Sequence, residues 1–171
     1  LSGTNGQVSN TLVIGAGDSG KAIVCTYTNT RKSTTFRLAK AWGANSTAGN
    51  IASLAATTGL TNNTAVLNST ASTATNGPVV TVFAGETATL PIETMSPGTL
   101  ANYTTTVNCD AGTLTGTNGQ VAGNTLAITA AATATSPITC TYTNTPKTAT
   151  LQLAKAWGAN SSASDSASIG A

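Results

Sequence analysis

The chain has 171 residues, a net charge of +2, no histidine and only 7% charged residues. An ordinary soluble domain has about 25% charged residues, so polarity here comes mainly from Thr, Ser, Asn and Gly. The small, unclustered charge excludes the basic footprint of a nucleic-acid-binding protein, and no apolar run approaches the ~18 residues that span a bilayer. Without histidine, the usual general base and metal ligand are both missing. We therefore expect no enzyme, no metal site and no other cofactor.

One stretch of the sequence occurs twice. Residues 25–45 and 140–160 are identical at 16 of 21 positions, with an offset of 115. A period of this length is that of a domain, and it is too long for one coil of a solenoid. We expect tandem repeats of about 115 residues: 1–32 is the C-terminal part of an upstream repeat, 33–146 is one complete repeat, and 147–171 is the N-terminal part of the next.

The pattern within the complete repeat predicts strands throughout. Short runs rich in Thr, Val, Ile and aromatic residues are separated by Gly, Asn, Asp and Pro, and they lie at 34–42, 78–84, 87–93, 102–109, 124–130 and 137–144. Residues 46–76, rich in Ala, Ser, Thr and Asn, contain strands whose positions the pattern leaves open. About seven short strands in ~115 residues predict an all-β fold, an antiparallel β-sandwich.

Side chains alternate between the two faces of a strand, so parity separates the interior from the solvent. This alternation places Lys40 and Asn144 among apolar residues. Lys40 shares its face with Phe36, Leu38 and Trp42, and Asn144 shares its face with Ile138, Cys140 and Tyr142. The threonines at 104–106 are interpreted as the solvent face of a strand, because threonine suits strands without any ligand.

The lysine and the asparagine have two interpretations. Lys40 could lie at a strand end with its amine in water while Asn144 caps a turn. Alternatively, Lys40 is buried, loses its proton and lies close to the carboxamide of Asn144. A protonated acid would then polarise the carbonyl, the amine would attack it, and ammonia would leave an intramolecular isopeptide bond.

Such a reaction needs an acid, and the chain has five: Asp18, Glu86, Glu93, Asp110 and Asp165. Only Glu86 and Glu93 lie in the middle of the repeat. Glu93 is the better candidate because it follows an apolar run, although simple parity places it opposite Leu90 and Ile92. Pro91 could introduce a bulge that turns Glu93 inward.

Three cysteines are an odd number, and the repeat explains it. Cys109 and Cys140 belong to one period and share parity with apolar neighbours, which predicts a disulfide closing a loop of about thirty residues; the alternative is a pair of free, buried thiols. Cys25 corresponds to Cys140, so its partner is expected about five residues before Leu1. A disulfide would place the protein in an oxidising compartment.

Three short motifs carry a resemblance to a known family. They are "FRLAKAW" (36–42, repeated as "LQLAKAW" at 151–157), "LPIETMSPGTLANY" (90–103) and "TYTNT" (141–145). The chain resembles the prealbumin-like, Cna B-type repeat domains of large bacterial surface adhesins and pilus-like proteins. The resemblance implies an Ig-like, prealbumin-like sandwich in which Lys40 and Asn144 are joined and Glu93 assists. The spacer "GTLA" before Tyr103 is longer than the family's usual link.

The resemblance also implies a role outside the cell. We expect a structural repeat, a spacer or stalk in a long bacterial cell-surface or secreted adhesin or fibre, with neighbouring repeats of the same protein as its partners. The alternative is a self-assembling subunit of an extracellular filament or sheath, in which chains of one kind exchange strands. Neither reading includes nucleic-acid binding or membrane insertion.

Overall fold

The computed structural model describes residues 11–63, 66–116, 123–134 and 137–170. The chain divides into two units, Leu1–Thr30 and Arg31–Ala171. The described part of the first unit contains one short 3-10 helix, η1 (Ala16–Asp18), and no named strand. All named strands belong to the second unit, between Ser33 and Pro146.

The second unit is built of short strands, as the sequence predicts. The strands are β1 (Ser33–Trp42), β2 (Ile51–Leu54), β3 (Leu67–Thr70), β4 (Thr75–Asn76), β5 (Val80–Phe83), β6 (Thr87–Thr89), β7 (Glu93–Met95), β8 (Tyr103–Cys109), β9 (Thr113–Thr115), β10 (Thr125–Ala127) and β11 (Ile138–Pro146). Two further 3-10 helices are η2 (Leu100–Asn102) and η3 (Ala132–Ala134). The all-β fold class is confirmed.

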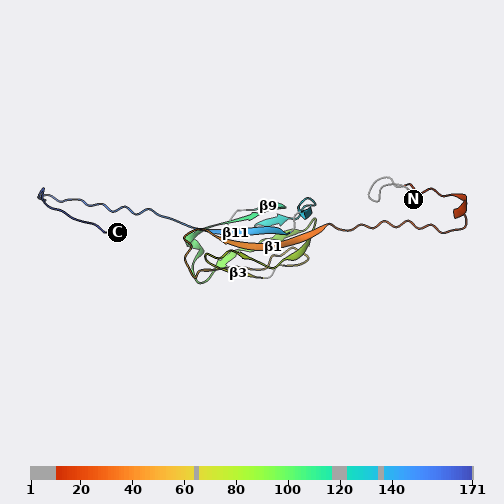
Figure 1. Ribbon diagram of the computed structural model, residues 1–171, viewed down its shortest axis with the longest axis horizontal. Coiled ribbons are helices and arrows are strands. Elements are labelled where there is room, and N and C mark those ends of the chain that lie inside the picture. Colours follow the sequence, from red (N-terminus) through yellow and green to blue (C-terminus); the bar gives the residue numbers. More distant parts are fainter. Residues whose placement is uncertain (1–10, 64–65, 117–122, 135–136, 171) are drawn as a thin grey trace. The chain divides into compact units, whose positions relative to one another are not determined.

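The strands form three sheets. The largest has the order β4-β1-β11-β8, with β5 also paired to β1, and the smaller ones have the orders β6-β10-β9 and β3-β2-β7. The pairs are antiparallel except that β1 and β11, the first and last strands, run parallel and side by side (Figure 1). In this register Phe36 lies opposite Ile138 and Trp42 opposite Asn144. The start of β1 and the end of β11 therefore lie at opposite ends of this sheet.

The core follows the alternation of the strands. Phe36 and Leu38 of β1, and Ile138, Cys140 and Tyr142 of β11, are all at most 1% exposed. Burying one large apolar side chain stabilises the fold by about 1.5–3 kcal/mol. The remaining core side chains come from the other strands, the loops and η3: Leu54, Leu60, Leu67, Val82, Ala88, Leu90, Val107, Leu126, Ile128 and Ala132.

Some element boundaries differ from the sequence prediction. The run 87–93, predicted as one strand, is divided into β6 and β7, which belong to different sheets. Pro91 lies in the break, where a residue without an N–H group removes no ladder hydrogen bond. The open stretch 46–76 contains β2, β3 and β4, and the short strand β9 was not predicted. The total is eleven strands in the described residues, where about seven were expected.

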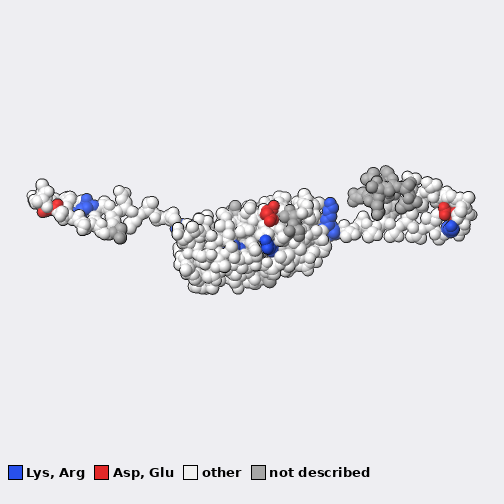
Figure 2. Space-filling view, viewed as in Figure 1, with Lys and Arg blue, Asp and Glu red and all other residues white. Residues whose placement is uncertain are grey.

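The surface carries few charges. In the view of Figure 2 most of the sandwich surface is neutral, with isolated charged side chains only. In β8 and β11 the outward positions are occupied by threonines and asparagine, so hydroxyl and amide groups hydrate the sheet. Among the described residues there is no helix whose length and hydropathy would allow it to cross a membrane.

A disulfide joins two neighbouring strands of the largest sheet. Cys109 of β8 and Cys140 of β11 are opposite each other in the antiparallel register, and their sulfur atoms are bonded. The two cysteines are 31 residues apart in the sequence. Cys25, in the first unit, is exposed and unpaired in the described part of the chain.

We predict that removing this disulfide destabilises the sandwich. A crosslink across a loop of this length reduces the entropy of the unfolded chain, so Cys109→Ala with Cys140→Ala should lower the free energy of unfolding by about 2–4 kcal/mol. Denaturant titration of the full chain measures this loss. Cys25→Ala is the matched control and should leave the free energy of unfolding unchanged. An equal loss in both variants would contradict the prediction.

Candidate crosslink site

Three polar side chains from three strands meet inside the sandwich. Lys40 is on β1, Glu93 is the first residue of β7, and Asn144 is near the end of β11. Lys40 Nζ lies 3.3 Å from Glu93 Oε1, and Asn144 Nδ2 donates a hydrogen bond to the same oxygen at 3.0 Å. The amine and the carboxamide are therefore held against one carboxyl oxygen.

The strands position these side chains by simple alternation. Lys40 follows Phe36 and Leu38 on the inward face of β1, and Asn144 follows Tyr142 on the inward face of β11. Glu93 faces inward because the chain changes sheets at 90–92, which interrupts the alternation of inward and outward side chains. Ile92 is 49% exposed as a result, while the Glu93 side chain is fully buried.

Water is excluded from the cluster. The side chains of Lys40 and Glu93 are 1% and 0% exposed, and Asn144 is 0% exposed. An isolated ion in such a place would cost several kcal/mol, so each charge needs a partner or must be neutralised, the ammonium by losing a proton and the carboxylate by gaining one. The second interpretation of the sequence, a buried Lys40, is the one that this geometry shows; the amine does not lie in water.

The Lys40 amine has further polar neighbours besides Glu93. It donates to the backbone carbonyl oxygens of Ala41 at 2.9 Å and of Tyr142 at 3.2 Å. It also lies 4.7 Å from the centre of the Trp42 ring, a cation–π distance. These contacts restrict the rotation of the Lys40 side chain and hold its nitrogen beside Glu93.

Burial shifts the protonation of both ionisable groups toward their neutral forms. Burial lowers the pKa of Lys40 to about 8, although the Glu93 carboxylate acts in the opposite direction. Burial raises the pKa of Glu93, against the effect of Lys40. Oε2 of Glu93 accepts no hydrogen bond from the described residues, which also favours a protonated acid. One proton exchanged between the two groups gives a neutral amine, and a neutral amine is a nucleophile.

Sequence reasoning missed one member of the site, Thr105 of β8. It was assigned to a solvent face with its neighbours, yet it is only 7% exposed. Its hydroxyl donates to Asn144 Oδ1 at 2.7 Å. The signal that would have found it is parity, because Thr105 alternates with the buried residues Tyr103 and Val107.

The other mid-repeat acid, Glu86, is engaged elsewhere. Its carboxylate accepts hydrogen bonds from the hydroxyl and N–H of Thr61 and from the N–H of Phe83, and Arg31 Nη1 lies 3.9 Å away. Burial acts to raise the pKa of Glu86, but the hydrogen bonds and Arg31 outweigh it, and the pKa is lowered. A carboxylate that stays ionised cannot donate a proton, so Glu86 does not supply the acid. Its hydrogen bonds instead connect the loop at Thr61 with Phe83, the last residue of β5.

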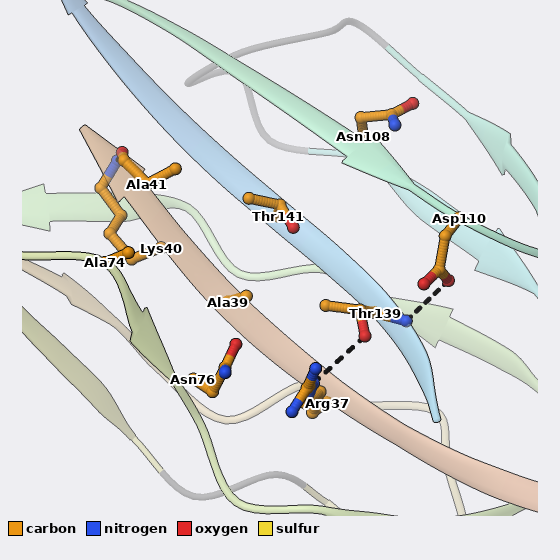
Figure 3. Close-up of a pocket in the computed structure, with 10 residues that line it drawn as sticks. All are labelled: Arg37, Ala39, Lys40, Ala41, Ala74, Asn76, Asn108, Asp110, Thr139 and Thr141. Atoms are coloured by element: carbon orange, nitrogen blue, oxygen red, sulfur yellow. Dashed lines mark hydrogen bonds between the residues drawn. The ribbon is translucent and has the colours of Figure 1, made fainter. Parts of the chain in front are cut away.

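The outer face of the largest sheet has a depression of about 360 Å³ (Figure 3). Two of its charged groups lie on either side of Thr139: Arg37 Nε donates to the Thr139 hydroxyl at 3.1 Å, and the Thr139 N–H donates to Asp110 at 2.8 Å. Both groups are therefore hydrogen-bonded within the protein, and the other lining residues are Lys40, whose side chain is buried, and alanines, asparagines and a threonine. The described residues include no group of three or more His, Cys, Asp or Glu that could hold a metal ion.

The second copies of the site residues lie outside the sandwich strands. Lys155, the counterpart of Lys40, is exposed, as are Leu151, Leu153 and Trp157 around it. Asn29 and Cys25, the counterparts of Asn144 and Cys140, are also exposed. Similar sequence thus forms a buried strand at 33–42 and no named strand at 148–157, because in the described residues only the first copy has partner strands to pack against.

Comparison with known proteins gave a limited result. No protein-family model matches the chain, and no curated protein matches it. A solved structure of the major pilin protein (T-13) from Streptococcus pyogenes serotype GAS131465 is similar, with 11% identity, a TM-score of 0.31, and coverage of 68% of this chain and 46% of that one. A mutant of the major pilin from Streptococcus pyogenes gives 17% identity, a TM-score of 0.28, and coverage of 67% and 48%. This chain spans about half the length of both pilins.

The shifted lysine predicts a pH dependence of stability. Asn144→Ala removes the carboxamide and leaves Lys40 as an amine, whose pKa falls from 10.5 in the unfolded chain to about 8 in the fold. Between about pH 8 and pH 10.5, the two pKa values, the unfolded state binds more protons than the folded state. The free energy of unfolding should therefore rise with pH, by up to about 3 kcal/mol in total.

Denaturant titration at pH 7 and pH 10 measures this rise. The matched control is the double variant Asn144→Ala/Lys40→Met, which keeps every other ionisable group. Subtracting the two pH profiles isolates the contribution of Lys40 together with its effect on Glu93. The assignment is wrong if the single and double variants depend on pH in the same way.

Proposed function

We propose that the chain is a structural repeat, a spacer or stalk segment of a long extracellular bacterial surface or secreted fibre, and that an isopeptide bond between Lys40 and Asn144 closes its sandwich. The observation that supports this proposal is that the buried Lys40 amine and Asn144 carboxamide, on the adjacent first and last strands, both contact Oε1 of Glu93. Replacing a buried ion pair by apolar residues of similar volume is often neutral or stabilising, so stability alone does not account for the polar cluster at this place.

The proposed reaction balances within the cluster. The Lys40 ammonium gives a proton to Glu93, and the neutral amine attacks Cγ of Asn144. Glu93 then protonates Nδ2, which it already contacts at 3.0 Å, and the Cγ–Nδ2 bond breaks to release ammonia. The new amide nitrogen returns one proton to Glu93. Each domain reacts once, so the chain is no enzyme in the ordinary sense.

The position of the bond suits a protein under tension. Force enters at the start of β1 and leaves at the end of β11, which lie at opposite ends of the sheet. A bond between Lys40 and Asn144 would pass this force directly from one strand to the other. The roughly one hundred residues between them would then bear no load, and unfolding by traction would require breaking a covalent bond.

The repeated sequence supports a chain of such domains. Residues 1–32 carry the last-strand sequence with Asn29, and residues 147–171 carry the first-strand sequence with Lys155. In this proposal each terminal segment belongs to a neighbouring repeat, whose remaining strands cover its apolar residues. Pro146 stiffens the short linker that follows β11.

The exposed apolar residues of the terminal segments favour a second candidate. Leu151, Leu153 and Trp157 are 82%, 47% and 50% exposed, and Ile23 and Tyr27 are 43% and 78% exposed. Separate chains could cover these residues by exchanging strands and so form a filament or sheath. Electron micrographs of purified material separate the two: isolated beaded rods support the spacer, and ordered polymers support strand exchange.

We predict that the purified chain is lighter than its sequence mass. After reduction of the disulfide, loss of one ammonia should lower the intact mass by about 17 Da. The variants Lys40→Ala, Glu93→Ala and Asn144→Ala should each have the full sequence mass, because each removes the amine, the acid or the carboxamide.

Lys155→Ala provides the matched control for this measurement. Lys155 lies in the same local sequence as Lys40 but is exposed, so its removal should leave the loss of about 17 Da in place. If the reduced chain has its full sequence mass, or if Lys155→Ala abolishes the loss, the proposed crosslink is wrong.

A further inference from the structure

The carboxamide of Asn144 is held from both sides. On one side its nitrogen donates to Glu93, at 3.0 Å. On the other side its oxygen accepts from the hydroxyl of Thr105, at 2.7 Å. The acid therefore contacts the atom that must leave, and a different residue contacts the oxygen on which negative charge would develop.

The β-sheet places this hydroxyl by register. Thr105 of β8 is the direct antiparallel partner of Asn144 on β11, and the disulfide between Cys109 and Cys140 joins the same two strands four residues away. A β-branched side chain has few rotamers, and Thr105 is only 7% exposed. The donor is thus fixed before any reaction begins, and water does not compete for it.

We propose that Thr105 is a catalytic residue of the crosslinking reaction, whose hydroxyl stabilises the oxyanion that forms on Asn144 Oδ1 when the Lys40 amine attacks. This inference rests on the proposed function. It divides the work between two residues: Glu93 moves the protons, and Thr105 holds the charge. Attack forms the Nζ–Cγ bond and shifts the carbonyl π electrons onto Oδ1. They return when the Cγ–Nδ2 bond breaks, so Thr105 ends with its own proton.

A preorganised donor to an oxyanion is a large contribution to catalysis. Removing one such donor slows acyl transfer by about 10²–10³-fold. Thr105 neither gives up nor accepts a proton overall, but its hydroxyl also acts to lower the pKa of Glu93. Loss of the hydroxyl should therefore lower the maximal rate that the reaction reaches at any pH, in addition to any displacement of the pH profile.

The test is a time course of crosslinking in the full chain. Protein unfolded in denaturant before it has reacted is diluted into buffer, samples are quenched in acid, and the fraction lighter by about 17 Da is measured by intact mass. Circular dichroism on the same samples reports the folded fraction, so that the rate is expressed per folded molecule. The series is repeated across pH.

Three variants are compared with the unsubstituted chain. Thr105→Val keeps the shape and removes the donor, so the maximal crosslinking rate across the pH series should fall about 100-fold or more. Thr105→Ser restores a hydroxyl and should restore most of the rate. Thr106→Val makes the same exchange on the exposed face of β8, and it should crosslink at the unsubstituted rate.

The outcomes separate this inference from the proposed function. If the unsubstituted chain never becomes lighter, both fail. If it does and folded Thr105→Val crosslinks equally fast, the oxyanion role of Thr105 is wrong and the crosslink stands. A Thr105→Val variant whose pH profile is displaced but whose maximal rate is unchanged would also overturn the role, because only the protonation of Glu93 would then depend on the hydroxyl. A slow Thr105→Ser would overturn it too, because a restored hydroxyl would then not restore the rate.

Discussion

A lysine amine and a glutamate carboxyl, both removed from water, lie 3.3 Å apart where two sheets of the sandwich face each other. Neither group could stay there alone, because an unpaired buried ion costs several kcal/mol. Lys40 belongs to the largest sheet and Glu93 to the sheet β3-β2-β7, so their contact fixes how these two layers meet. The change of sheet at Pro91, which turns Glu93 inward, is the local feature on which this contact depends.

The last strand is held on both of its edges. On one side the disulfide of Cys140 and the hydrogen bond from Thr105 tie β11 to β8. On the other side β11 lies parallel to β1, with Asn144 near Lys40 through their common partner Glu93. The polar cluster and the disulfide are thus placed around one strand, and that strand leads to the next segment of the chain. In the proposed function, tension would leave the domain through this strand.

Much of this arrangement could be predicted from the sequence, for identifiable reasons. Lys40 and Asn144 stood out because strict alternation put polar side chains on apolar faces. The repeat matched Cys25 with Cys140 and so left Cys109 and Cys140 as the pair within one period. Glu93 was ambiguous, since parity has no meaning across the break at 90–92, where the chain passes between sheets. Thr105 was hidden within a run of threonines, although every second residue around it is buried. The parallel pairing of β1 with β11 needed coordinates, because alternation gives a strand's faces but not its neighbours.

The account is tested most directly by a high-resolution crystal structure of the purified full chain, refined without any restraint between Nζ of Lys40 and Cγ of Asn144. The account predicts continuous electron density between these atoms at an amide bond length of about 1.33 Å, with Glu93 beside the new bond and Thr105 on its oxygen. Separate density for an intact carboxamide, with the Lys40 amine at van der Waals distance or in solvent, would contradict it.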